Sequence, residues 1–159
     1  MTIMTKAAVT AAALALGLST AHAAGTYTLD NEARILSGEA FGDAALAESA
    51  GYPDPELVIQ WAARLGLSDG QVAAATRIRD AMIADAKEIA PDYVRLEHEL
   101  HALFEGGRAG SAKVRALTAD IAELEGRLRF IHLDARLRMR FELTRDQLRA
   151  YNRIKAGES

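Results

Sequence analysis

The feature that most constrains the fold is a regular spacing of apolar residues between Val114 and Ala135. The intervals between successive members alternate between three and four residues without a break. Such positions share one side of a helix, so the pattern predicts a long helix that packs along a partner as in a coiled coil. The members of this seam are Val114, Leu117, Ile121, Leu124, Leu128, Ile131 and Ala135.

A second long helical pattern precedes the seam and is separated from it by the short stretch "GGRAGS". Pro91 interrupts this pattern, so we expect a kink or a break near Ala90. Two long helices joined by a short glycine-containing turn form an antiparallel hairpin. The apolar repeat after the interruption consists of Ile89, Tyr93, Leu96, Leu100 and Leu103.

Two similar five-residue words, "LSDGQ" at 67–71 and "LTRDQ" at 143–147, stand before helical patterns. In each word a hydroxyl residue is followed three residues later by glutamine, which is the pattern of a capping box. The leucine ahead of each cap is typical of a hydrophobic staple. The sequence therefore predicts helix starts at Leu67, Ser68, Gln71 and at Leu143, Thr144, Gln147.

A short helix is expected before the first word, in "YPDPELVIQWAARLG". Asp54 is suited to cap it, Pro55 to begin it and Gly66 to end it. A second short helix follows the second word. We therefore predict an all-α fold in which a long antiparallel helical hairpin is flanked by two short helices.

The N-terminus has the pattern of a secretory signal peptide over residues 1–23. Lys6 precedes a short apolar run, and Ala21-His22-Ala23 matches a cleavage signal. A retained N-terminal anchor is the alternative, although the run is short for a membrane span. We expect a periplasmic protein without disulfides, since the chain has no cysteine. Residues 24–50 are expected to form a weakly ordered arm, and residues 51–155 the helical domain.

The order and spacing of these features resemble the LTxxQ proteins of the Spy/CpxP superfamily over roughly residues 51–155. The resemblance is carried by "LGLSDGQ" before a long helix, the hairpin turn and "RFIHLDARLRMRFELTRDQLRAYNRI". Serine replaces threonine in the first word, which keeps the cap. The resemblance implies a homodimeric cradle that holds unfolded proteins without ATP or senses envelope stress. The related CnrX and ZraP groups sense metals and bind zinc.

A basic block covers residues 127–155, with nine basic against three acidic residues. Apolar residues are interleaved with the arginines, and such a surface suits loosely held unfolded chains. The alternative is a solvated face paired with acids of a neighbouring helix or subunit. The residues expected to bind clients are Arg129, Phe130, Leu133, Arg136, Leu137, Arg138, Met139, Arg140 and Phe141.

The charge of this block also fits other partners. An anionic membrane or lipopolysaccharide surface would attract it. Nucleic acid would fit the charge as well, but the predicted export argues against it.

Three histidines suggest a second function, the sensing or binding of a divalent transition metal. His98 and His101 lie three residues apart, and His132 with Met139 could add further ligands. Arg136 stands where the metal-binding relatives have another histidine. In the predicted hairpin His132 and His98 are roughly 20 Å apart, so they could share an ion only across a subunit interface. The alternative is that all three are ordinary surface or partly packed side chains.

Catalysis is not indicated by any motif in the chain. The sequence has no nucleophile elbow, phosphate-binding loop, zinc-protease motif or dinucleotide-binding glycine pattern. We therefore expect a non-enzymatic protein without a cofactor. The first hypothesis is an ATP-independent chaperone or envelope-stress protein, and the alternative is a heavy-metal sensor.

Overall fold

A computed structural model describes residues 27–39, 41 and 44–157. The regular secondary structure of this part is entirely helical, which confirms the all-α class. Among these residues, no helix combines the length and apolar character needed to cross a membrane. The predicted signal peptide, residues 1–23, lies outside the described residues.

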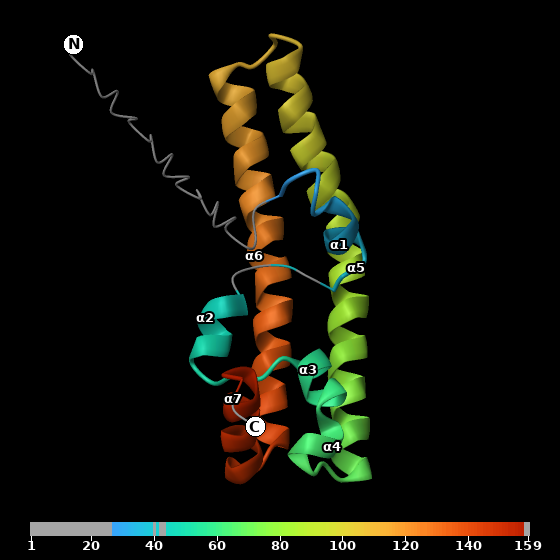
Figure 1. Ribbon diagram of the computed structural model, residues 1–159. Helices are drawn as coiled ribbons and strands as arrows, with labels where there is room; N and C mark the ends of the chain where they lie inside the picture. Colours follow the sequence, from blue (N-terminus) through green and yellow to red (C-terminus); the bar gives the residue numbers. More distant parts are fainter. Residues whose placement is uncertain (1–26, 40, 42–43, 158–159) are drawn as a thin grey trace, which may run out of the picture.

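Two long helices form the hairpin predicted from the apolar seams (Figure 1). Helix α5 (Asp69–Glu105) and helix α6 (Ser111–Glu142) run antiparallel and pack together. Gly106 caps the end of α5, and Gly107 has a left-handed φ of 62°, which glycine adopts without strain. The predicted seam is confirmed: Leu117, Ile121, Leu128 and Ala135 are buried, while Val114, Leu124 and Ile131 are half-buried.

The break that Pro91 could cause does not occur, because α5 continues through this residue. A proline inside a helix removes one backbone donor and crowds the preceding turn, which bends or breaks a helix. Here Ala90 and Tyr93 are buried, whereas Pro91 itself is exposed. Beyond this region α5 leans toward α6 in Figure 1. Burial on both sides of the proline therefore keeps the helix continuous.

The short helix expected before the first word is divided in two at Trp61. Helix α3 (Pro55–Gln60) begins at the predicted cap, where the Asp54 carboxylate accepts a hydrogen bond from a first-turn amide at 2.8 Å. Helix α4 (Ala62–Leu65) ends, as predicted, at Gly66, which has a left-handed φ of 61°. The prediction of a single helix was wrong, because the backbone of Trp61, with a φ of −101° and a ψ of 16°, departs from the helical conformation.

Helix α7 (Arg145–Lys155) supplies the partner of that tryptophan. Tyr151 is fully buried, and its ring lies 5.3 Å from the Trp61 ring, measured between centroids. The Tyr151 hydroxyl also accepts a hydrogen bond from the Asp54 amide at 3.1 Å. Aromatic packing and one hydrogen bond thus join α7 to the segment that contains α3 and α4.

The N-terminal segment, expected to be a weakly ordered arm, forms two short helices in its described part. These are α1 (Glu32–Leu36) and α2 (Ala44–Ser49). Ile35 and Phe41 are buried in the same cluster as residues of both long helices. This segment therefore contributes directly to the core of the hairpin.

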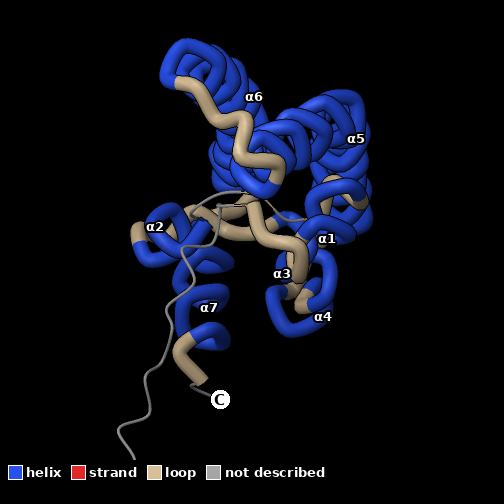
Figure 2. The backbone as a smooth tube through the Cα atoms, turned by 90° about the horizontal axis from the view of Figure 1, so that it is seen from above, coloured by secondary structure: helices blue, strands red, loops and turns tan. Residues whose placement is uncertain are grey.

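All the short helices lie on one side of the hairpin, as Figure 2 shows in a view from above. The core divides into two clusters of buried side chains. The upper cluster includes Phe41, Tyr93 and Leu128, and the lower cluster includes Met139 and Tyr151. The lower cluster therefore joins side chains of α3, α4 and α7 with those of both long helices.

Candidate functional site

The two repeated words form the capping boxes that the sequence predicts. In the first, the Gln71 amide donates to Ser68 Oγ at 3.3 Å, and the Ser68 amide donates to Gln71 Oε1 at 3.1 Å. In the second, the Gln147 amide and Thr144 Oγ1 are 3.2 Å apart, and the Thr144 amide and Gln147 Oε1 are 2.9 Å apart. Leu143 is buried and Leu67 half-buried in the lower cluster, as staples would be.

The two glutamines also bind each other, which the sequence analysis did not foresee. Gln71 Nε2 donates to Gln147 Oε1 at 2.8 Å, and Gln147 Nε2 donates to Gln71 Oε1 at 3.0 Å. Each Nε2 has a second acceptor two residues before the other helix's cap: Glu142 O at 2.8 Å and Gly66 O at 3.4 Å. The two words therefore form one nearly symmetric polar cluster that joins the starts of α5 and α7.

Arg136, expected to bind clients, is instead part of the interior. Only 6% of its surface is exposed, and both its Nη1 and Nη2 lie 2.7 Å from Asp54 Oδ2. The same carboxylate caps α3 through its other oxygen. Because this ion pair links α6 to α3, the assignment of Arg136 to a client surface is corrected.

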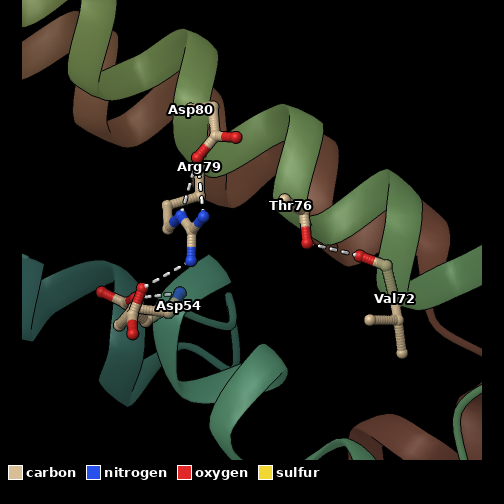
Figure 3. Close-up of polar contacts among 6 residues, drawn as sticks. Asp54, Val72, Thr76, Arg79 and Asp80 are labelled. Carbon is tan, nitrogen blue, oxygen red and sulfur yellow. Dashed lines mark hydrogen bonds and ion pairs between the residues drawn. The ribbon is translucent and has the colours of Figure 1, made fainter.

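Helix α3 is fixed from the other long helix as well (Figure 3). Arg79 on α5 places Nη1 3.4 Å from Glu56 Oε2 and Nη2 2.7 Å from Asp80 Oδ1. Figure 3 shows this arginine beside the start of α3, where Asp54 lies. The start of α3 is therefore contacted by arginines of both long helices, Arg136 at Asp54 and Arg79 at Glu56.

Three other residues of the predicted client surface are also involved in packing. Met139 is fully buried, and Leu133 is half-buried. Arg140 Nη1 donates to the Gly51 carbonyl at 2.8 Å, and its guanidinium lies 4.9 Å from the centre of the Tyr52 ring. These contacts hold the segment before α3 against α6. Met139 is therefore enclosed and Arg140 is engaged within the fold, whereas Leu133 stays partly exposed.

His132 lies beside Arg136 on the inner face of α6 and is 6% exposed. Its Nε2 has no hydrogen-bond partner within the described part of the chain. Burial, together with the nearby positive charge of Arg136, lowers the pKa of His132 from 6.5 to about 4. His132 is therefore neutral at pH 7 and enclosed in the fold.

The remaining predicted residues form an exposed surface on the opposite side of α6. Phe130 is 65% exposed, Leu137 43% and Phe141 87%. Intervals of seven and four residues place them on one side of the helix, and we call them the outer stripe. Arg127 and Arg138 are exposed nearby, whereas Arg129 pairs with Glu125 at 2.8 Å.

The histidines do not converge on a metal site. His98 Nε2 lies 2.9 Å from Glu32 Oε2, and His101 Nε2 lies 3.1 Å from Glu105 Oε1. Across the described residues, no group of three or more histidine, cysteine or carboxylate side chains is arranged to hold a metal ion. His132 is enclosed separately, beside Arg136. Within the described residues, the three histidines therefore do not share a site, as their predicted separation implied, and an ion shared across a subunit interface stays a prediction.

Comparisons of the chain with protein-family models, with curated proteins and with solved structures give no match.

Proposed function

We propose that this protein is a periplasmic, Spy/CpxP-like chaperone that binds non-native proteins and limits their aggregation without ATP. The carrying observation is the outer stripe, in which two phenylalanines and a leucine are exposed on a rigid helix. Exposed apolar surface of this kind marks an interaction site on a folded protein. The capping boxes, the hairpin and the resemblance to LTxxQ proteins support the same proposal.

The arrangement suits weak and adaptable binding. Phenyl rings and a leucine can contact apolar segments of many sequences without a shaped pocket. The exposed Arg127 and Arg138 carry charge that can attract acidic clients and keep the complex in solution. Arg136 and Arg140 form their contacts within the fold, so they stabilise the structure and are not proposed to bind the client.

The test is light scattering of an aggregating client protein with purified mature chain and no ATP. Replacing Phe130, Leu137 and Phe141 together with serine should abolish suppression of aggregation. Leu46→Ser is the matched control, since this leucine is 73% exposed on α2 but lies outside the stripe. Equal suppression by the triple variant and the wild type would refute the proposal.

Charge is tested separately. Arg127→Glu with Arg138→Glu should weaken the holding of acidic clients, while Arg115→Glu, an exposed position nearer the hairpin turn, should not. Vesicles containing anionic lipid distinguish the membrane alternative: binding of the protein to vesicles but not to unfolded proteins would replace the chaperone proposal.

A homodimer, implied by the resemblance, is part of the proposal. Analytical ultracentrifugation of the wild type and of the triple serine variant measures it. A dimer retained in the variant leaves the stripe available for clients, whereas a monomeric variant would show that a second copy covers the stripe.

A further inference from the structure

The described N-terminal residues 27–39 and 41, here called the strap, lie along α5 (Figure 1). Ile35 and Phe41 of the strap are buried in the upper cluster. The Phe41 ring meets the Tyr93 ring edge-on, with 5.2 Å between centroids. The strap thus covers apolar surface on α5 that would otherwise meet water.

The surface beneath the strap is shaped by small side chains. Ala86 and Ala90 on α5 are buried under it. Gly38 of the strap has a φ of 72°, and a Cβ atom there would lie 2.7 Å from the Ile83 carbonyl oxygen. The strap backbone therefore crosses α5 in direct contact, with one large apolar side chain inserted on each side of the glycine.

Polar contacts occur within the strap and between the strap and α5. The Tyr27 hydroxyl donates to Glu32 Oε2 at 2.7 Å, and His98 Nε2 lies 2.9 Å from the same oxygen. Solvent-accessible contacts of this kind contribute little to stability. The strap is therefore held by its two buried side chains, Ile35 and Phe41, together with the partly buried Tyr27, whose ring meets those of Tyr93 and His98 edge-on.

A partly open groove of about 380 Å³ continues this surface toward the hairpin turn. Its apolar lining comes from the first strap residues and from the last turns of α5. Leu29 and Phe104, which line it, are both exposed. The other lining residues include Tyr27, Leu100, His98 and His101.

We propose that client segments bind at a second site, which consists of this groove and the α5 surface beneath the strap, here called the seat. The strap occupies the seat until a client displaces it. The strap shows the chemistry that fits: two large apolar side chains six residues apart, with a small residue midway. This inference rests on the proposed function. It adds a client-binding surface on α5 to the outer stripe on α6, and the strap would compete with the client for this surface.

A fluorescent peptide with the sequence of residues 27–41 tests this second site directly. In the full mature chain, the substitutions Ile35→Ser and Phe41→Ser should release the strap from the seat. This variant should bind the peptide, as measured by fluorescence anisotropy. The wild type, with its own strap seated, should bind about tenfold more weakly. A peptide carrying the same two serines is the control and should not bind. No binding of the natural peptide to the variant would overturn the inference.

Client competition completes the test. An unfolded client should displace the peptide from this variant, and the variant should suppress aggregation at an about tenfold lower concentration than the wild type. Failure of displacement, or equal suppression by the two proteins, would overturn the inference. The outer-stripe serine variant keeps strap and seat intact, so its holding activity reports on the proposed function alone.

A milder variant guards against misfolding of the double serine variant. Glu32→Gln removes the charged partner of His98 while both buried strap side chains stay. Peptide binding and client suppression should shift in the same direction by a smaller factor. An unchanged Glu32→Gln protein, together with a double variant that does not fold, would count against the strap as a competitor.

Discussion

Along the second half of α6, both sides of the helix carry large side chains, but in opposite environments. On the inner face, Arg136 and Met139 are enclosed, and the arginine is paired with Asp54 on the segment before α3. On the outer face, Phe130 and Phe141 are exposed. The comparison shows that the neighbouring element decides burial: a guanidinium is enclosed where a carboxylate meets it, and a phenyl ring stays exposed where no described element packs over it.

The largest expected effect comes from removing the inner arginine. Arg136→Ala should lower the free energy of unfolding by about 3 kcal/mol, because Asp54 is left partly enclosed without its countercharge. Urea denaturation followed by circular dichroism measures this. Arg138→Ala, two residues away on the exposed side, is the control and should change stability by less than about 0.5 kcal/mol. Similar losses in both variants would remove the distinction between the two faces.

Acid should lower the stability of the fold through His132, which lies on the same inner face of α6. Its folded-state pKa of about 4 lies below the unfolded value of 6.5, so the unfolded chain takes up the proton first. Stability should be highest above about pH 7 and fall by up to about 3 kcal/mol as the pH decreases to 4.

Urea midpoints measured at several pH values test this acid sensitivity. His132→Gln should flatten that part of the profile, whereas His101→Gln at an exposed position should leave it unchanged. A wild-type profile that is already flat between pH 7 and 4 would contradict the enclosed neutral histidine.

The paired glutamines should have a smaller effect, at the end of α6. Gln71→Ala and Gln147→Ala should each cost about 1–2 kcal/mol, since a cap contact and an inter-helix hydrogen bond are lost together. The double variant should cost less than the sum of the two, with a coupling energy of about 1 kcal/mol. Full additivity would mean that the two side chains do not interact in solution. Gln60→Ala, on the exposed side of α3, serves as the control.

The smallest effect on stability is expected on the outer face. Phe130→Ser with Phe141→Ser should change the free energy of unfolding by less than about 0.5 kcal/mol, since both rings are already exposed. A loss of client holding in this stable variant would then report on binding. A large loss of stability would instead place the rings in an interface within the folded protein.

Local patterns were sufficient to predict much of the fold. The seam from Val114 to Ala135, both capping boxes and the glycines at 66 and 106 are set by neighbours in the sequence, and the structure confirms them. The division occurs at Trp61, which packs against Tyr151, 90 residues away in the chain. Long-range packing of this kind leaves no signal in a local window.

The candidate site was harder to predict for the same reason. The basic block indicated a cationic and apolar surface, but Arg136 is enclosed and paired with Asp54, which lies far from it in the sequence, whereas Arg138 is exposed. The glutamine pair had a usable signal: Gln71 and Gln147 are each 38 residues from Ala109 in the hairpin turn. An antiparallel hairpin brings such positions to the same end, which here places the start of α7 near the start of α5.

This symmetry about the turn has a consequence for how the chain folds. Contacts beside Gly106 and Gly107 join residues close in sequence, whereas the glutamine contacts span 76 residues. Closing a longer loop costs more chain entropy, and non-local contacts form more slowly. We expect the hairpin to zip from the turn toward the paired glutamines. The end that carries α3, α4 and α7 would then close last and open first, as amide hydrogen exchange would show residue by residue.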